Sequence, residues 1–205
     1  MAKKARLVVL ASGFGSNLEA ILFACEDNLL PAKVVAVISD RGAAYALERA
    51  RDHNIAAVYH PWKPYREAGK SRQEYDTDLA DLTASFEPDY VILAGWMRIL
   101  SMDFLRHFPM KVINLHPALP GTFPGTQAIE RAFEAFQAGQ IEHTGVMVHF
   151  VPDEGVDDGP VIAQEVIPIY DDDTLDGLEQ RVHAIEHQIL VEALQKAILE
   201  KFVHG

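Results

Sequence analysis

The chain has 205 residues, of which 49% are hydrophobic and 23% charged, a balance typical of a globular protein with an ample core. Its formal net charge of −12 argues against a broad nucleic-acid-binding surface, although it is compatible with a local basic pocket for phosphate. The single cysteine, Cys25, cannot form an internal disulfide. No apolar run reaches transmembrane length and none reads as a signal peptide, so the sequence predicts a cytoplasmic protein.

In chain order, the first part of the sequence alternates apolar runs with amphipathic segments. Strands are predicted at residues 7–11, 34–38, 56–59 and 90–94, and helices at 18–25, 44–51 and 72–86. The stretch 61–70, with two prolines and a glycine, is expected to be a loop. This alternation predicts βαβ units and a parallel sheet with right-handed crossovers.

The second part of the sequence changes this pattern. A short helix near residues 102–107 precedes a strand at 111–115, and a helix at 128–138 precedes two extended runs at 144–151 and 161–169. A long helix is predicted at 174–203. Because no repeat, low-complexity stretch or linker interrupts the chain, residues 1–205 are expected to form a single α/β domain.

Asn114 and His116 lie at the end of an apolar run, directly before Pro117. Alternate side chains of a strand share a face, so both should point the same way at a strand's carboxyl end, where open α/β sheets bind ligands. Pro117 stops the strand because it has no N–H for the ladder. An amide that can donate to an oxyanion, beside a proton carrier, indicates acyl-group chemistry.

A glycine-rich turn with the sequence Ser12-Gly13-Phe14-Gly15-Ser16-Asn17 lies between the first predicted strand and the first helix. Glycines allow close approach of a ligand, and a helix N-terminus directs free N–H groups at an anion, with Ser16 or Asn17 able to cap the helix. The third glycine of a dinucleotide fingerprint and the Lys-Ser/Thr pair of a nucleoside triphosphate loop are absent. The turn therefore indicates a site for a single phosphate, with an ordinary capped turn as the alternative.

Two later segments could complete a site. The apolar run 94–100 contains one arginine and could line a pocket for a flat ring, although ordinary packing is the favoured interpretation. A carboxylate from the acidic turn 153–158 could reach His116, raise the pKa of its imidazole and hold a water for proton relay, with a solvated loop as the alternative. His149 alternates with Met147 along an extended run, as a satisfied core histidine does.

Taken together, these segments closely resemble the phosphoribosylglycinamide formyltransferase family of the folate formyltransferase superfamily. The resemblance rests on residues 12–18, 93–100, 149–151, 156–160 and 181–187 and on Asn114-Leu115-His116-Pro117. Asn-x-His-Pro with a later Asp-x-Gly-Pro is typical of the superfamily, and the glycine loop and compact length narrow it to this family. The resemblance implies a single-domain, Rossmann-like formyltransferase fold with a mostly parallel, twisted sheet of about seven strands flanked by helices.

The resemblance also assigns expected roles to individual residues. Asn114, His116 and Asp157 are the implied catalytic residues. The N-terminal half is expected to bind the phosphate and the ribonucleotide, and the C-terminal half to bind the folate and carry out catalysis. The implied substrate-binding residues are Gly13, Phe14, Gly15, Ser16, Asn17 and Glu186. The implied folate-binding residues are Arg72, Met97, Arg98, Ile99, Leu100, Asn114, Val151, Pro152, Asp153 and Asp157.

The implied reaction moves the formyl group of 10-formyltetrahydrofolate to the amine of glycinamide ribonucleotide in purine biosynthesis. Asn114 and protonated His116 are expected to stabilise the oxyanion, and Asp157 to support the imidazolium and help move a proton through water. No metal is implied. The expected partners are the two small molecules, without nucleic acid or membrane, and the protein is expected to be a monomer or homodimer.

Three other functions stay open at this point. Formyltetrahydrofolate hydrolases could use the same three residues with water as acceptor, but they carry an N-terminal regulatory domain, for which we expect no room before Leu7. Methionyl-tRNA formyltransferases add a C-terminal RNA-binding domain, whereas this sequence ends at Gly205. A non-catalytic module that binds a phosphorylated metabolite would not need all three residues together.

One departure from the family pattern follows Pro117. The family commonly shows Ser-Leu-Leu-Pro there, whereas this chain reads Ala118-Leu119-Pro120-Gly121. The turn behind the site is therefore expected to differ in its loop contacts more than in its chemistry.

Overall fold

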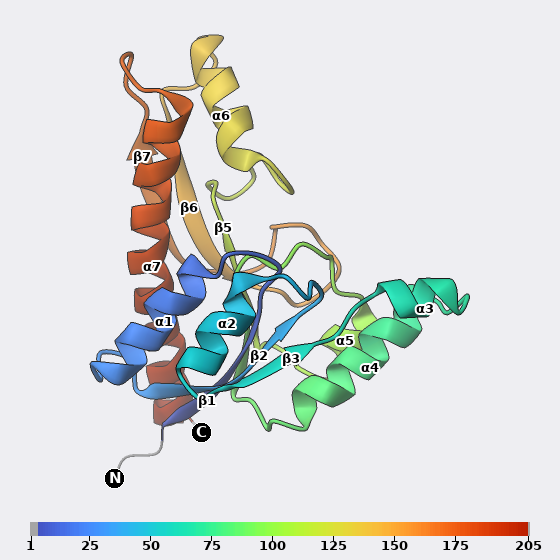
Figure 1. Cartoon of the computed structure of the whole chain (residues 1–205). Coiled ribbons are helices and arrows are strands. Elements are labelled where there is room, and N and C mark those ends of the chain that lie inside the picture. Colours follow the sequence, from blue (N-terminus) through green and yellow to red (C-terminus); the bar gives the residue numbers. More distant parts are fainter. Residues whose placement is uncertain (1–3, 205) are drawn as a thin grey trace.

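The computed structural model of the chain describes residues 4–204, and the strands in this range form one sheet of seven strands in the order β3-β2-β1-β4-β5-β6-β7 (Figure 1). The strands are β1 (Ala5–Leu10), β2 (Ala32–Ser39), β3 (Ala56–Tyr59), β4 (Tyr90–Leu93), β5 (Val112–His116), β6 (His143–Phe150) and β7 (Val161–Pro168). Strands β1 to β5 pair in parallel, whereas β6 and β7 are antiparallel. The predicted mostly parallel α/β sheet is confirmed.

Helices cover both faces of this sheet. They are α1 (Ser16–Glu26), α2 (Tyr45–Asp52), α3 (Lys63–Glu67), α4 (Arg72–Ala84), α5 (Met102–Leu105), α6 (Ala128–Gln137) and α7 (Leu175–His204). Residues of α1, α2, α6 and α7 pack on one face, and residues of α4 and α5 on the other. The long terminal helix runs beside α1 (Figure 1).

The loop predicted for residues 61–70 is wrong in part, because α3 lies within it. Pro64 stands in the first turn of this short helix. A proline is tolerated there because its missing N–H has no partner within the helix in any case, and its fixed φ suits the helix. The prolines that suggested a loop are therefore compatible with a helix start.

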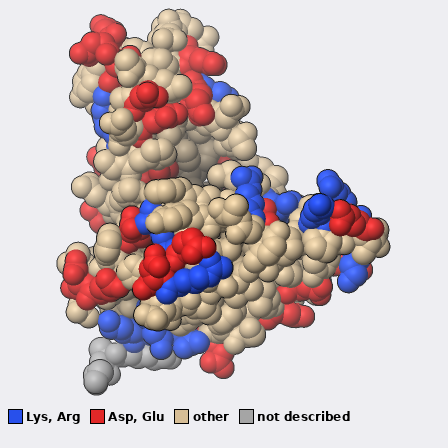
Figure 2. Space-filling view, in the orientation of Figure 1, with Lys and Arg blue, Asp and Glu red and all other residues tan. Residues whose placement is uncertain are grey.

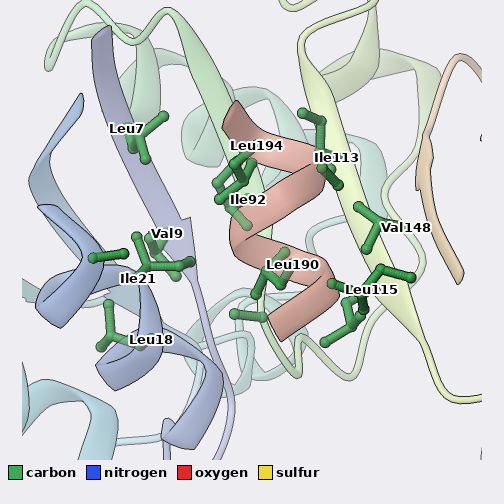
Figure 3. Close-up of a cluster of buried hydrophobic side chains, with 14 of the residues drawn as sticks. Leu7, Val9, Leu18, Ile21, Ile92, Ile113, Leu115, Val148, Leu190 and Leu194 are labelled. Carbon is green, nitrogen blue, oxygen red and sulfur yellow. The ribbon is translucent and has the colours of Figure 1, made fainter. Parts of the chain in front are cut away.

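Alternation along the strands decides which side chains face which helices. Leu7 and Val9 of β1 belong to the cluster with α1 and α7, whereas Val8 and Leu10 belong to the cluster with α4 and α5. A strand covered on both faces carries an unbroken apolar run, as the sequence of β1 does. Figure 3 shows the α7 side of this core, with the labelled side chains Leu7, Val9, Leu18, Ile21, Ile92, Ile113, Leu115, Val148, Leu190 and Leu194.

The same alternation orients β5. Ile113 and Leu115 face the cluster that contains α7, so Asn114 and His116 are turned to the opposite face of the sheet. The chain leaves β1 for β2 on one side and later returns to β4 on the other, which makes the β1–β4 boundary a point where the strand order reverses. Ligands of open α/β sheets bind beside such a point, at the carboxyl ends of the strands.

Charged side chains of both signs lie on the face that Figure 2 draws, with a group of basic side chains along its lower edge. In the described part of the chain, none of the helices is both long enough and apolar enough to cross a membrane.

Candidate active site

Asn114, His116 and Asp157 lie together at the carboxyl end of β5. The Asn114 amide donates to Asp157 Oδ1 over 3.0 Å, and His116 Nδ1 lies 3.3 Å from Asp157 Oδ2. The loop between β6 and β7 folds back over the sheet and brings Asp157 to residues about 40 positions earlier in the chain. Asp157 thus contacts both of the other predicted catalytic residues.

Asp157 has a strained backbone. Its φ is 54°, in the left-handed region that residues with a Cβ rarely adopt. The Gly125 N–H donates to Asp157 Oδ2 over 2.8 Å, in addition to the contacts with Asn114 and His116. Such strain persists where the surroundings hold a residue in place, and it is concentrated at functional sites.

His116 is buried and its imidazole has two different neighbours. Nε2 lies 3.1 Å from the Phe123 carbonyl, which can only accept, so Nε2 carries a hydrogen. Burial lowers the pKa of His116 below its ordinary value, and this effect exceeds the opposing effect of the Asp157 carboxylate. As expected, the Asp157 carboxylate raises the pKa of His116. The expectation of a raised pKa overall is wrong, because burial lowers it by more.

His149 belongs to the site although the sequence indicated only a core histidine. It pairs with Asn114 across β5 and β6, and its Nε2 lies 3.2 Å from the Asn114 amide nitrogen. Its Nδ1 donates to the Phe150 carbonyl over 2.8 Å, and its Nε2 also lies 3.6 Å from Asp157 Oδ1. The register of β5 and β6 places His149 beside Asn114. The alternation of His149 with Met147 along the sequence predicted its burial but could not identify this partner.

Asp157 is ionised in this setting. Burial raises the pKa of its carboxyl, but contacts with His149, the Gly125 N–H and His116 outweigh burial and leave the pKa below its ordinary value. The site therefore holds a carboxylate 3.3 Å from an imidazole whose charged form is disfavoured by burial.

The segment after Pro117 forms a turn without the family's serine. The Thr122 N–H and hydroxyl both donate to the Leu119 carbonyl, over 3.0 and 2.7 Å. Leu119 packs on β6 at Gly145, where an added Cβ would lie 2.5 Å from Leu119 Cδ2. The departure from the family pattern thus coincides with a turn anchored on β6.

The glycine-rich turn stands between β1 and α1, as predicted, but its cap differs. Gly15 is the N-cap with φ 79°, and Ser16 is already the first helical residue, so neither Ser16 nor Asn17 caps the helix. A Cβ on Gly15 would lie 2.8 Å from the Cβ of Ala46, so α2 leaves no room for a side chain there. Gly13 has open space around it.

Glu186 of α7 reaches the glycine-rich turn. The Asn17 amide donates to Glu186 Oε2 over 3.4 Å, and Asn17 Oδ1 is buried without a partner among the described residues. His183 Nδ1 lies 2.8 Å from the same Glu186 oxygen, although the sequence pointed only to Glu186. This hydrogen bond raises the pKa of His183. A spacing of three residues on a predicted helix was the available signal for this pair.

Phe14 stands apart from the other residues of the turn. Its ring is 66% exposed and stacks on Tyr45 with the centroids 5.1 Å apart. The Arg49 guanidinium lies 4.6 Å from the Phe14 ring centroid, and Arg49 Nε donates to the Phe14 carbonyl. The side chain thus packs towards α2.

Residues 97–100 form a partly exposed turn after β4. Met97 and Ile99 are exposed, whereas Leu100 is buried. Arg98 donates to Asp40 Oδ2 over 2.8 Å, and Ser12 links the same carboxylate to this turn. Its hydroxyl donates to Asp40 Oδ1 over 2.7 Å and accepts from the Met97 N–H over 3.1 Å. The glycine-rich turn and the 97–100 turn are therefore fixed to each other.

Arg72 supports the other end of that turn. It donates to the Ile99 carbonyl and, through Nε, to Asp76 Oδ1 over 3.0 Å. Asp76 is fully buried and its Oδ2 accepts from the Ser101 N–H over 2.8 Å. Arg72 thus lies at the predicted folate segment, where it holds the backbone.

The segment after β6 contacts the start of α5, which follows the 97–100 turn. Glu154 Oε1 accepts from the Met102 N–H over 2.8 Å, Asp153 Oδ1 accepts from the Gly155 N–H, and Val151 N–H donates to the Val112 carbonyl. Pro152 is half-buried between them. The two segments predicted to contact the folate therefore lie on one edge of the sheet, beside Asn114 and Asp157.

Among residues 4–204, no three His, Cys, Asp or Glu side chains are arranged to hold a metal ion. The arrangement consists of hydrogen-bond donors, an imidazole and a carboxylate. These groups can stabilise a developing oxyanion and move a proton.

Comparison with known proteins identifies the family. Residues 5–194 match the family model described as formyl transferase. The chain is 48% identical over 207 residues to phosphoribosylglycinamide formyltransferase of Schizosaccharomyces pombe, covering 96% of this chain and 98% of that protein. It is 43% identical to the Escherichia coli protein of the same name, covering 89% of this chain and 82% of that protein.

A solved structure gives the same result. The crystal structure of glycinamide ribonucleotide transformylase 1 from Symbiobacterium toebii superposes with a TM-score of 0.87 at 39% identity, covering 95% of this chain and 88% of that one. The family match spans nearly the whole chain, and the similarity holds in both sequence and fold. The chain belongs to the formyl transferase family.

Proposed function

We propose that this protein transfers the formyl group of 10-formyltetrahydrofolate to the amine of glycinamide ribonucleotide, a step of purine biosynthesis. The observation that carries the proposal is the contact of Asn114, His116 and Asp157 at the carboxyl end of β5. The relatives that match over nearly their full length are named for this reaction. No metal takes part in the proposed chemistry.

The two substrates would occupy different parts of one site. The glycine-rich turn offers backbone N–H groups at the start of α1 for the phosphate, and Glu186 offers a carboxylate for the ribose hydroxyls. The turn 97–100 and the segment 151–153 would hold the folate ring on the other side of Asn114. The N-terminal half would thus supply most of the ribonucleotide site and part of the folate site, and the C-terminal half the rest of the folate site and the catalytic residues.

In the proposed reaction the amine attacks the formyl carbon, and the carbonyl electron pair moves to the formyl oxygen. Asn114 and His116 donate hydrogen bonds to that oxyanion. The attacking nitrogen loses a proton, Asp157 helps to pass it through water to N10 of the folate, and the C–N10 bond then breaks. The products are the formylated ribonucleotide and tetrahydrofolate, so all atoms balance.

Both donors are engaged with protein groups before the formyl oxygen arrives. His116 Nε2 donates to the Phe123 carbonyl, and the Asn114 amide contacts Asp157 and His149. Catalytic hydrogen bonds commonly form only when substrate is bound. The mechanism therefore requires His116 to exchange the Phe123 carbonyl for the formyl oxygen.

The decisive assay incubates the protein with 10-formyltetrahydrofolate, with and without glycinamide ribonucleotide, and follows the formyl group. Transfer that depends on the ribonucleotide supports the proposal. Release of formate without the ribonucleotide would assign a hydrolase instead, and binding of the ribonucleotide without loss of the formyl group would assign a binding module.

Variants test the roles of the residues. Asp157→Asn is expected to lower turnover by about 10² or more, because it removes the carboxylate next to the imidazole. Asn114→Ala removes one oxyanion donor, which typically costs about 10²–10³ in turnover. Asp158→Asn is the matched control, because it removes the same charge from the exposed residue that follows Asp157. Folded Asp157→Asn and Asn114→Ala proteins with normal turnover would contradict the assigned roles.

The monomeric or dimeric state and the cytoplasmic location stay predictions from the sequence.

A further inference from the structure

Arg131 of α6 donates hydrogen bonds to the backbone of the turn 123–125, which lies beside the site. Its Nη2 donates to the Phe123 carbonyl and to the Pro124 carbonyl, each over 2.7 Å. Its guanidinium carbon lies 5.9 Å from the centroid of the Phe123 ring. A planar guanidinium can make several fixed hydrogen bonds at once, which suits it to hold two carbonyls in one geometry.

The same short turn contacts both His116 and Asp157. The Phe123 carbonyl accepts from His116 Nε2 over 3.1 Å, so one oxygen is shared by Arg131 and His116. Two residues later, the Gly125 N–H donates to Asp157 Oδ2, the oxygen closest to His116 Nδ1. The turn therefore connects Arg131 to both members of the His–Asp pair.

This turn would not hold its shape by local preference. Four residues in and around the turn have positive φ, and two of them carry a Cβ. They are Gly121, Phe123, Gly125 and Gln127. L-residues rarely adopt this region without outside support. Leu119, which precedes the turn 123–125, packs on Gly145. Arg131, which follows it, donates side-chain hydrogen bonds to the turn itself.

We propose that Arg131 is a positioning residue, which fixes the turn 123–125 against His116 and Asp157 and so holds the pair in its reactive arrangement. The inference rests on the proposed function, since it concerns the residues assigned to formyl transfer. When His116 Nε2 turns to the formyl oxygen, the Phe123 carbonyl keeps Arg131 as its donor. This partly buried carbonyl is then not left without a partner, which makes the exchange less costly.

The test compares Arg131→Ala with Arg131→Lys and Arg131→Gln. Loss of the guanidinium is expected to lower kcat about tenfold, within the range for displacement of catalytic groups by up to 1 Å, while KM for the ribonucleotide changes less than about twofold. Arg131→Lys keeps the cation and one donor and should recover part of kcat. Arg131→Gln keeps a donor without the charge, so its kcat should lie between those of Arg131→Ala and Arg131→Lys. If Arg131→Ala fails to fold, Arg131→Gln decides.

A second readout does not depend on turnover. NMR titration of His116 reports its ionisation, and the groups that act on it are burial, Asp157, the Phe123 carbonyl, His149 and Arg131. Arg131 lowers the pKa of His116 and the Phe123 carbonyl raises it. Both contacts change when Arg131→Ala releases the turn, so the titration of His116 should shift from that of the wild type. Arg106→Ala is the control, because this exposed arginine pairs only with Asp103 of its own short helix in the described structure.

The outcomes are distinct. Wild-type kcat in folded Arg131→Ala would overturn the proposal. So would a fall in kcat with an unchanged His116 titration, because the loss of activity would then arise away from the His–Asp pair. If the wild-type protein does not transfer formyl groups, the proposed function fails, and the His116 titration still decides whether Arg131 positions the pair.

Discussion

His116 is subject to opposing influences on a single imidazole. Burial favours the neutral ring, whereas the Asp157 carboxylate favours the charged one, and burial prevails in the free protein. An entering substrate that displaces the Phe123 carbonyl changes both its hydrogen bond and its surroundings. In the free protein His116 already carries the Nε2 hydrogen that the proposed reaction would present to the formyl oxygen.

Stability should depend on pH through this residue. The pKa of His116 is lower in the folded than in the unfolded chain, where it is about 6.5. Its contribution to the free energy of unfolding is therefore complete above about pH 6.5 and is lost as the pH falls through the folded pKa. Urea unfolding at several pH values should show a steeper loss below about pH 6.5 for wild type than for His116→Gln. Equal slopes would mean that His116 titrates alike in both states.

Gly15 tests the glycine-rich turn at the same scale. Gly15→Ala places a Cβ 2.8 Å from that of Ala46 and forces an L-residue to φ 79°, so the turn must shift. Affinity for the ribonucleotide, measured by calorimetry, should fall more than affinity for the folate. Gly139→Ala, which imposes a similar positive φ (68°) in open space outside the glycine-rich turn, is the control. Equal affinities in Gly15→Ala and wild type would remove the turn from the ribonucleotide site.

At the scale of elements, α4 carries the arginine that supports the 97–100 turn. Ser71 and Glu74 form a complete capping box at its start, with the Ser71 hydroxyl accepting from the Glu74 N–H and the Glu74 carboxylate accepting from the Ser71 N–H. The first helical residue is Arg72. A well-fixed helix start therefore holds the side chain that binds the Ile99 carbonyl.

Ser71→Ala is expected to reduce the free energy of unfolding by about 1 kcal/mol, because the hydroxyl that satisfies the Glu74 N–H is lost. Urea denaturation measures this loss. Gln73→Ala, at an exposed position of the same turn, is the control and should change stability by less than about 0.5 kcal/mol. If both variants have the same stability, the cap contributes nothing.

The whole molecule depends on two apolar clusters separated by the sheet, and α7 contributes to the larger one. Leu190 and Leu194 point from α7 towards Ile92 and Ile113 (Figure 3). This packing fixes the orientation of β5 because Ile113 and Leu115 are buried against it. The α7 core therefore determines which way Asn114 and His116 face.

Leu190→Ala should lower the free energy of unfolding by about 2–5 kcal/mol, since the fully buried side chain leaves a cavity. Leu199→Ala removes the same atoms from a half-exposed position of the same helix and should cost far less. Thermal or urea unfolding compares the two. Similar losses would show that α7 does not pack more tightly at Leu190 than at Leu199.

The site was predictable from the sequence to different degrees. Asn114 and His116 are two residues apart on a strand, so alternation alone places them on one face. The acidic turn alone indicated only that one of its carboxylates could reach His116. The family resemblance identified that carboxylate as Asp157. His149 and Arg131 gave no such signal, because their contacts with Asn114 and Phe123 depend on strand register and on the path of a loop.

By itself, the sequence determined the α/β architecture, the strands and all but one of the helices, since apolar periodicity and glycine and proline positions are local properties of the chain. Only the tertiary structure decided that α3 interrupts the stretch 61–70, that Gly15 caps α1, and that burial lowers the pKa of His116 despite Asp157. Each of these depends on groups distant in sequence or on how much water the fold excludes. Periodicity records which side chains are buried, but the partners and the electrostatic balance of buried groups arise only when the segments meet.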